Sequence, residues 1–140
     1  MNTLVGERLS IITAKAQTTR HRVLGVLSGP HFQIIYSDTP GIITPQYTLQ
    51  KSMMQAVRSS LTDADVLLWV VDVRDSTVDA ALQKTLEDHQ APVLLLLNKV
   101  DLVDEAALEE ALAYWSNTVS VHAVLPVAAL KAYNTTAVFE

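Results

Sequence analysis

Hydrophobic and polar positions along the chain follow two alternating periods, one typical of strands and one typical of helices. Short apolar runs rich in leucine and β-branched residues predict strands, and longer segments with an apolar stripe every three to four residues predict helices. The predicted strands are 21–28, 32–37, 66–73, 93–97 and 121–127. The predicted helices are 49–61, 76–89 and 104–115, and a further helix is expected to begin within 132–140.

The order of these elements predicts an α/β fold. Gly29 and Pro30 separate the first two predicted strands, which is typical of a β-hairpin with a two-residue connection. Every later strand is separated from the next by a helical segment, which favours parallel pairing through right-handed crossovers. We therefore expect one hairpin followed by a mostly parallel sheet with helices on both sides, in a single domain without an internal boundary.

The run 93–97 is apolar throughout and is followed by Asn98, Lys99 and Asp101. Such a run predicts a strand buried on both faces, and open α/β sheets bind ligands at the carboxyl ends of their strands. Asp101 can accept hydrogen bonds from the ring N–H and the exocyclic amine of guanine together, Asn98 can fix its register, and the methylenes of Lys99 can cover the purine. Asn-Lys-x-Asp is also the tetrapeptide by which GTPases recognise guanine, and adenine lacks that donor pair.

Composition narrows the classes of protein without choosing one. The chain has 140 residues, 49% of them apolar, which suffices for one domain with a core. It has no cysteine, so the sequence offers no disulfide and no thiolate metal site. The net charge of −5 gives no overall basic surface for nucleic acid. No apolar run approaches the roughly 20 residues of a membrane span, and residues 1–5 have neither the basic flank nor the apolar core of a signal peptide.

Three further segments could carry chemistry. Asp38-Thr39-Pro40-Gly41 directly follows a predicted strand, where Asp38 could hold Mg²⁺ through water and Gly41 allows a backbone N–H to approach a phosphate; a simple turn is the alternative. In 17–20, a threonine could complete a Mg²⁺ shell, or its hydroxyl could bond its own backbone in a solvated loop. The segment 128–131 follows the last predicted strand, where a backbone amide could contact the guanine carbonyl.

Asp72 suggests a different function. Asp38, Asp72 and Asp101 would all lie at strand carboxyl ends with Lys99 nearby, which is typical of the acidic Mg²⁺ pocket of a receiver-like phosphotransfer or interaction module. A capping or loop role for Asp72 is the favoured alternative. The histidines show no ligand spacing and no Gly-x-Ser-x-Gly occurs, so zinc sites and hydrolase triads receive little weight. The two tryptophans are interpreted as packing residues.

Taken in chain order, the segments 17–20, 38–41, 98–101 and 128–130 resemble a translation-factor-related GTPase of the TRAFAC class, and the longer string 4–22 is similar to the Era family. The resemblance runs over essentially all of residues 1–140. It implies a P-loop NTPase-like, Ras-like G domain built as a three-layer sandwich, with GTP or GDP and Mg²⁺ as cofactors. In that family an RNA-binding KH domain follows the G domain, and the protein helps mature the small ribosomal subunit.

The resemblance also implies roles for single residues. Thr19, with Thr18 as the alternative, would be the switch threonine on Mg²⁺, and Asp38 would bind Mg²⁺ through water. The Gly41 amide would sense the γ-phosphate. Ile42 stands where many GTPases carry a catalytic glutamine, so water positioning must come from elsewhere and hydrolysis should be slow. The phosphate and switch residues implied in this way are Thr18, Thr19, Asp38, Thr39, Pro40 and Gly41.

On the base side, Asn98, Lys99 and Asp101 would read guanine by the same resemblance. Ala128 departs from the usual Ser or Thr at the start of the last motif, which should weaken base binding slightly. The guanine-binding residues implied in this way are Asn98, Lys99, Asp101, Ala128, Ala129 and Leu130.

The main departure from the family is that no Gly-x-x-x-x-Gly-Lys-Ser/Thr occurs in the sequence. We expect the chain to begin inside the family's first helix, without the first strand and phosphate loop, and to hold no KH domain. The base-reading groups would then be present while the amide cradle, Lys and Ser/Thr that hold phosphates and Mg²⁺ are missing. Nucleotide binding and hydrolysis would be impaired, or the chain would be a non-catalytic binding module.

Partners and location follow from the family alone. The resemblance implies guanine nucleotide as the ligand, and small-subunit rRNA and the ribosomal subunit as partners through the KH domain. It places the protein in the bacterial cytoplasm, with peripheral association with the inner membrane as an added expectation.

Overall fold

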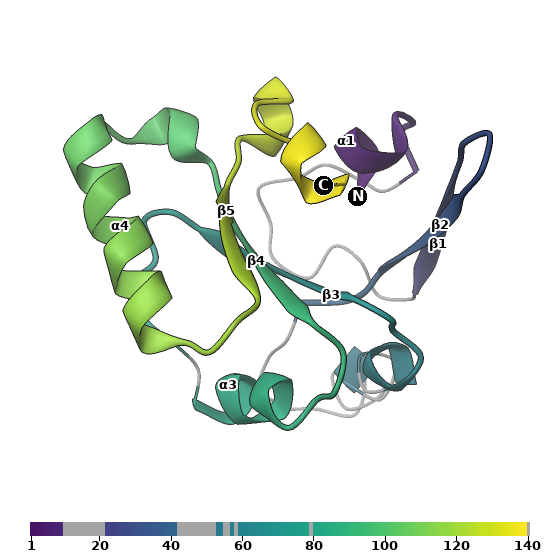
Figure 1. Ribbon diagram of the computed structural model, residues 1–140, viewed down its shortest axis with the longest axis horizontal. Helices are drawn as coiled ribbons and strands as arrows, with labels where there is room; N and C mark the ends of the chain where they lie inside the picture. Colours follow the sequence, from purple (N-terminus) through teal and green to yellow (C-terminus); the bar gives the residue numbers. More distant parts are fainter. Residues whose placement is uncertain (10–21, 42–52, 55–56, 58, 79, 140) are drawn as a thin grey trace. The chain divides into compact units, whose positions relative to one another are not determined.

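The computed structural model describes residues 1–9, 22–41, 53–54, 57, 59–78 and 80–139 (Figure 1). The chain divides into two compact units, residues 1–63 and residues 64–140. Each unit has its own sheet, and each is described by itself.

The first unit contains a short helix and an antiparallel hairpin. Helix α1 spans Asn2–Val5, and strands β1 (Val23–Ser28) and β2 (Gln33–Asp38) pair along their whole length. The predicted hairpin is confirmed. Its connection is longer than the predicted Gly29-Pro30 pair, because the Gly29 N–H donates to the carbonyl of Phe32 (2.9 Å) and β2 begins only after Phe32. A side chain at position 29 would collide with the Phe32 ring.

The two faces of this hairpin differ. On one face Gly25 lies so close to α1 that a Cβ there would meet Cγ2 of Val5 at 2.9 Å. On the other face Leu24, Val26 and Ile35 are 55%, 51% and 60% exposed. Among the described residues from 53 to 62 the chain is helical, as predicted for 49–61, and Val57 is buried in this stretch. The remainder of that predicted helix lies outside the described residues.

The second unit is built on a parallel sheet. Strands β3 (Leu67–Asp72), β4 (Val93–Asn98) and β5 (Ala123–Pro126) lie in the order β3-β4-β5, so β4 is central (Figure 1). The predicted parallel pairing is confirmed. Leu95 and Leu97 have no exposed surface, and Leu96 on the opposite side of β4 is also buried, which confirms the strand buried on both faces.

Two helices connect these strands. Helix α3 spans Ala80–Glu87 and begins later than the predicted 76–89. The Asp75 N–H donates to the carbonyl of Asp72 (2.9 Å) in a turn after β3, and residues 76–78 that follow are not helical. Helix α4 spans Glu105–Thr118 and begins where predicted, with the Asp104 side chain accepting from the Ala107 N–H (2.9 Å) as N-cap.

Short 3₁₀ helices complete the second unit. They span Val100–Leu102 (η1), Ala129–Lys131 (η2) and Thr136–Phe139 (η3). The helix expected to begin within 132–140 is only η3, because Ala132 and Asn134 have φ angles of 52° and 53° and left-handed residues interrupt a helix.

The core of the second unit lies between β3, β4 and α4. Trp115 of α4 is 1% exposed and meets the ring of Trp69 edge to face, with centroids 5.6 Å apart. Leu95 and Leu97 belong to the same cluster. Both tryptophans therefore pack, as predicted. Within the described ranges, no helix is long and apolar enough to cross a membrane.

Candidate functional site

The carboxyl ends of β3 and β4 bring polar groups to one edge of the sheet. Asp72 and Asn98 are the last residues of their strands and are paired directly in the register. The Val73 N–H donates to the carbonyl of Asn98 (2.8 Å), so the pairing continues past the strand ends. Because Leu97 is fully buried one residue earlier, the backbone that carries Asn98 is held rigidly by the core.

The Asn98 side chain joins two loops. Its Oδ1 accepts a hydrogen bond from the Ala129 N–H (3.0 Å), 31 residues away in sequence. Two backbone bonds reinforce the junction: the Val127 N–H donates to the Leu97 carbonyl (2.9 Å), and the Val100 N–H donates to the Val127 carbonyl (3.3 Å). The structure thus brings the predicted base-reading segment 98–101 next to the predicted segment 128–130.

Lys99 and Asp101 follow in two different settings. Lys99 has a φ of 67°, in the left-handed region, and its Nζ donates to Oδ2 of Asp72 at 2.8 Å. The left-handed turn at Lys99 ends the strand and starts η1, in whose first turn Asp101 is exposed. A carboxylate at this position is accessible as an acceptor for a ligand's N–H groups.

The loop after β5 is fixed by residues that sequence reasoning did not single out. Ala128 and Tyr133 exchange two backbone hydrogen bonds of 3.1 Å, and Asn134 Nδ2 donates to the Pro126 carbonyl at 2.9 Å. The available sequence signal was Asn134, because asparagine is one of the few residues that favour the left-handed conformation of a tight turn. Ala128 is 1% exposed, whereas Leu130 is 83% exposed at the start of this turn.

Asp72 is more than a loop residue. Its Oδ1 accepts from the backbone N–H of Arg74 (3.0 Å) and from Arg74 Nε (2.9 Å), and its Oδ2 accepts from Arg74 Nη2 (2.7 Å). The first bond is an Asx-turn, which fits the loop role of the capping or loop alternative favoured for Asp72 from the sequence. The partnership with Arg74 carried no sequence signal. The hydrogen bonds from Arg74 and Lys99 hold the pKa of Asp72 well below its usual value, despite partial burial of the carboxylate.

The predicted phosphate segment lies in the first unit. Asp38 is the last residue of β2, Pro40 is fully buried, and Gly41 is exposed with open space where a Cβ would stand. Thr39 lies between them, half-buried. Asp38 therefore ends the strand itself, one residue later than the predicted strand end at 37, and the loop begins at Thr39. The predicted switch residues Thr18 and Thr19, the neighbouring Gln17 and Arg20, and Ile42 lie outside the described residues.

For Mg²⁺, the part of the chain that the structure describes holds no group of three or more His, Cys, Asp or Glu side chains placed to bind a metal. Asp38 is the one predicted metal residue in that part. A single carboxylate acting through water fits a Mg²⁺ that takes most of its ligands from phosphates and water.

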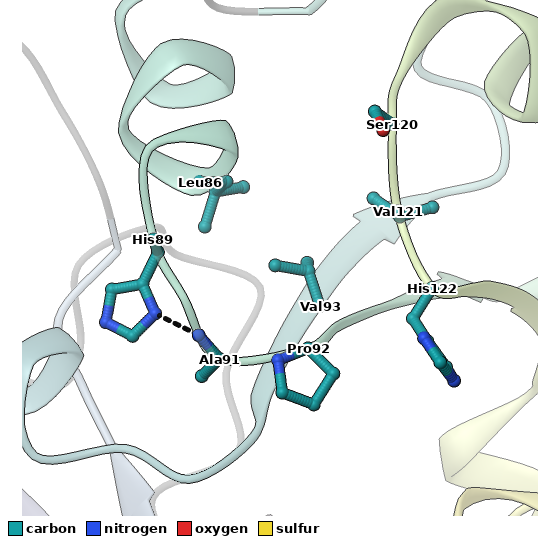
Figure 2. Close-up of a pocket in the computed structure, with 8 residues that line it drawn as sticks. All are labelled: Leu86, His89, Ala91, Pro92, Val93, Ser120, Val121 and His122. Carbon is teal, nitrogen blue, oxygen red and sulfur yellow. Dashed lines mark hydrogen bonds between the residues drawn. The ribbon is translucent and has the colours of Figure 1, made fainter.

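A hollow lies at the opposite end of the second unit's sheet (Figure 2). Figure 2 shows Leu86 and Val93 on its inner wall, with Ser120 and His122 on the neighbouring segment before β5. The His89 Nδ1 accepts from the Ala91 N–H (3.1 Å), which leaves the proton of the neutral ring on Nε2. Sequence reasoning gave no function to these residues, and their hydrogen bonding is that of a helix-to-strand turn.

Comparison with known proteins agrees with the geometry. The family model described as 50S ribosome-binding GTPase matches residues 1–99. A chloroplastic GTPase ERA-like protein of rice (Oryza sativa subsp. japonica) is 40% identical over 134 residues, covering 92% of this chain and 32% of the relative. GTPase Era of Alkaliphilus metalliredigens is 33% identical over 136 residues, covering 96% of this chain and 46% of the relative.

Solved structures of Era proteins are also similar to this chain. Era in complex with MgGDPNP and nucleotides 1506–1542 of 16S ribosomal RNA superimposes with a TM-score of 0.84 at 32% identity, over 99% of this chain and 48% of that one. A variant of Aquifex aeolicus Era bound to GDP and AlF4⁻ gives 0.86 at 31% identity, with the same coverage.

The chain spans between about a third and a half of the length of the relatives it matches. Its P-loop GTPase fold is that of the two Era structures. The chain therefore belongs to the family of 50S ribosome-binding GTPases, and within it to the Era type.

Proposed function

We propose that this chain recognises guanine nucleotides at the carboxyl ends of β4 and β5, in a protein that hydrolyses GTP. The observation that carries the proposal is the hydrogen bond between Asn98 Oδ1 and the Ala129 N–H. This bond joins the two predicted base-reading loops, and it leaves the carboxylate of Asp101 exposed beside them.

Each group has a chemical role in this proposal. Asp101 accepts hydrogen bonds from the ring N–H and the exocyclic amine of guanine, which adenine cannot offer together. The aliphatic stem of Lys99 covers one face of the purine. Asn98 accepts from the first amide of the turn Ala129–Lys131, which would position the next backbone amide, that of Leu130, toward the base carbonyl.

The proposed phosphate side lies in the first unit. Asp38 would hold Mg²⁺ through water and Gly41 would offer its amide to the γ-phosphate, with Thr19, or Thr18, completing the metal shell. We propose residues 1–140 as the G-domain part of an Era-type protein. Because these residues contain no Gly-x-x-x-x-Gly-Lys-Ser/Thr, we further propose that on their own they hold nucleotide mainly through the base and turn over GTP poorly or not at all.

The wider role follows from what one similar structure contains. Era was solved with nucleotides 1506–1542 of 16S ribosomal RNA, and we propose by that likeness a role in small-subunit assembly and rRNA maturation. A location in the bacterial cytoplasm, with or without peripheral membrane association, stays a prediction.

Titration of the 140-residue chain with fluorescent GDP and fluorescent ADP tests base recognition. We expect GDP to bind at least about tenfold more tightly, which corresponds to about 1.4 kcal/mol. Asp101→Ala should abolish the difference, whereas Asp65→Ala, an exposed aspartate of the same unit, should keep it. Equal affinities in the unmodified chain would remove the guanine assignment. GTP turnover close to that of a full-length relative would overturn the proposed impairment.

The receiver-like alternative has one observation in its favour, the 2.8 Å contact between Lys99 Nζ and Asp72 Oδ2. Both oxygens of Asp72 are however engaged by Arg74 as well. Treatment with labelled acetyl phosphate separates the two functions. An acid-stable label that appears on the unmodified chain and is lost in Asp72→Asn, together with no preference for GDP over ADP, would favour phosphotransfer.

A further inference from the structure

Asp72 contacts the base-reading loop without belonging to it. It ends β3, whereas the residues proposed to read guanine follow β4 and β5. The register nevertheless places Asp72 directly beside Asn98, and its carboxylate reaches the ammonium of the next residue, Lys99. The contact therefore depends on the pairing of two strands, because the partners are 27 positions apart in the sequence.

The carboxylate is itself oriented by Arg74. Arg74 Nε donates to Oδ1 (2.9 Å) and Nη2 donates to Oδ2 (2.7 Å), which is the planar two-point contact that a guanidinium makes with a carboxylate. A further bond from the Arg74 backbone N–H (3.0 Å) fixes Oδ1. The plane of the carboxylate is therefore fixed, and its Oδ2 is shared between Arg74 and Lys99. The Asp72 side chain is only 17% exposed.

Lys99 is the residue whose conformation this arrangement controls. Its backbone is left-handed, which few residues other than glycine adopt freely. Its long stem would otherwise sample many rotamers, since the side chain is half exposed. Anchoring the ammonium at Asp72 removes that freedom before any ligand binds, and the methylenes between the two fixed ends are held in place.

We propose that Asp72, oriented by Arg74, is a positioning residue that holds the Lys99 stem as a preformed surface for the guanine base. This inference rests on the proposed guanine recognition and adds to it a residue outside the Asn-Lys-x-Asp segment. It also gives Arg74 a function, because the two-point contact of its guanidinium fixes the orientation of the carboxylate that Lys99 binds.

A purely electrostatic role for Asp72 makes the opposite prediction. Removing the carboxylate leaves Lys99 and Arg74 without their shared counter-charge, so the edge of the sheet becomes more attractive to any anion. GDP and ADP carry the same phosphates and would gain equally. A positioning role instead lowers the affinity for GDP relative to ADP, because only guanine is held at this surface by Asp101 and so loses the contact when the Lys99 stem is no longer preformed.

The test measures the ratio of ADP to GDP dissociation constants in the 140-residue chain and its variants. We expect Asp72→Asn, which keeps the shape of the side chain, to lower this ratio about fivefold, within the range of measured coupling between neighbouring residues. Arg74→Lys should lower it about twofold, because a lysine cannot make the two-point contact. Asp72→Glu should recover part of the ratio, and Asp65→Asn should leave it unchanged.

A second measurement without nucleotide separates the possible failures. The acetylation rate of the Lys99 amine, followed by peptide mass spectrometry under dilute reagent, should rise in Asp72→Asn because the hydrogen bond that protects the amine is lost. If the unmodified chain shows no preference for GDP, the guanine proposal fails, whatever the amine result. If it prefers GDP and Asp72→Asn keeps the same ratio, or binds GDP and ADP more tightly by the same factor, the positioning role is overturned alone.

Discussion

The two sheets of this chain are built in opposite ways. Strand β4 is buried on both sides, with Leu95 and Leu97 at 0% exposure, whereas one face of the β1–β2 hairpin leaves Leu24, Val26 and Ile35 more than half exposed. The first arrangement holds its backbone through packing from every direction, and the second has packing on one face only. The polar residues proposed to read guanine follow the buried strand, which explains how Asn98 can join two distant loops with one side chain.

The largest expected effect is in the buried strand. Leu95→Ala removes a fully buried side chain between β3, β5 and α4, and should lower the free energy of unfolding by about 3 kcal/mol through lost burial and a new cavity. Ile35→Ala on the hairpin is the matched variant and should cost under about 1 kcal/mol. Urea denaturation of both variants, followed by far-UV circular dichroism, makes the comparison, because both tryptophans lie in the second unit. Equal losses would mean that the two sheets do not differ as described.

The next effect concerns the junction made by Asn98. Asn98→Ala removes the acceptor of the Ala129 N–H, and we expect a loss of about 2 kcal/mol in stability together with faster hydrogen exchange at that amide. Asn98→Asp keeps an acceptor oxygen and serves as the control, with slow exchange retained. Unchanged exchange at Ala129 in the alanine variant would show that the bond does not hold the loop.

A smaller, pH-dependent effect is expected at Asp72. Its pKa is lowered in the folded chain by the hydrogen bonds from Arg74 and Lys99, so its charged form stabilises the fold. This contribution is present above the unfolded pKa of about 4 and is lost progressively as the pH falls below that value toward the lower folded pKa. The stability difference between the unmodified chain and Asp72→Asn should be about 1 kcal/mol at pH 7 and shrink at pH 3. A constant difference would contradict the ion pair.

The smallest effect is expected on the open face of the hairpin. Val26→Thr keeps the shape and strand preference of the side chain, and it should change stability by no more than about 0.5 kcal/mol because that face is already in water. The matched swap Val73→Thr, in the core of the second unit, should cost about 2 kcal/mol by burying a hydroxyl. Thermal denaturation of the two variants measures the difference in their stability loss. A similar loss at both positions would contradict the described difference between the two sheets.

Much of the fold could be predicted because its signals are local. The uninterrupted apolar run of β4 marked a central parallel strand, and Asp104 marked the start of α4. The errors came from interactions that no local pattern encodes. The hydrogen bond from the Gly29 N–H to the Phe32 carbonyl closes a longer hairpin connection than predicted, and left-handed Ala132 and Asn134 reduced the last predicted helix to a short 3₁₀ turn.

The candidate site divides in the same way. Asn98, Lys99 and Asp101 could be named from the sequence because their order and spacing carry the chemistry of base recognition. The contacts of Asp72 with Lys99 and Arg74 could not, since they depend on the register between β3 and β4 and on the left-handed turn at Lys99. The sequence correctly placed Asp72 at the carboxyl ends of the strands, and only the structure showed which residues it contacts there.

The most direct test of base recognition exchanges the hydrogen-bonding pattern that Asp101 offers. Asp101→Asn presents one donor and one acceptor, which matches the ring N–H and the 2-carbonyl of xanthine and no longer matches the two donors of guanine. Competitive titration of this variant with GDP and xanthosine diphosphate should show that its preference has reversed in favour of the xanthine nucleotide. A variant that still prefers GDP would contradict the proposal that Asp101 reads the base.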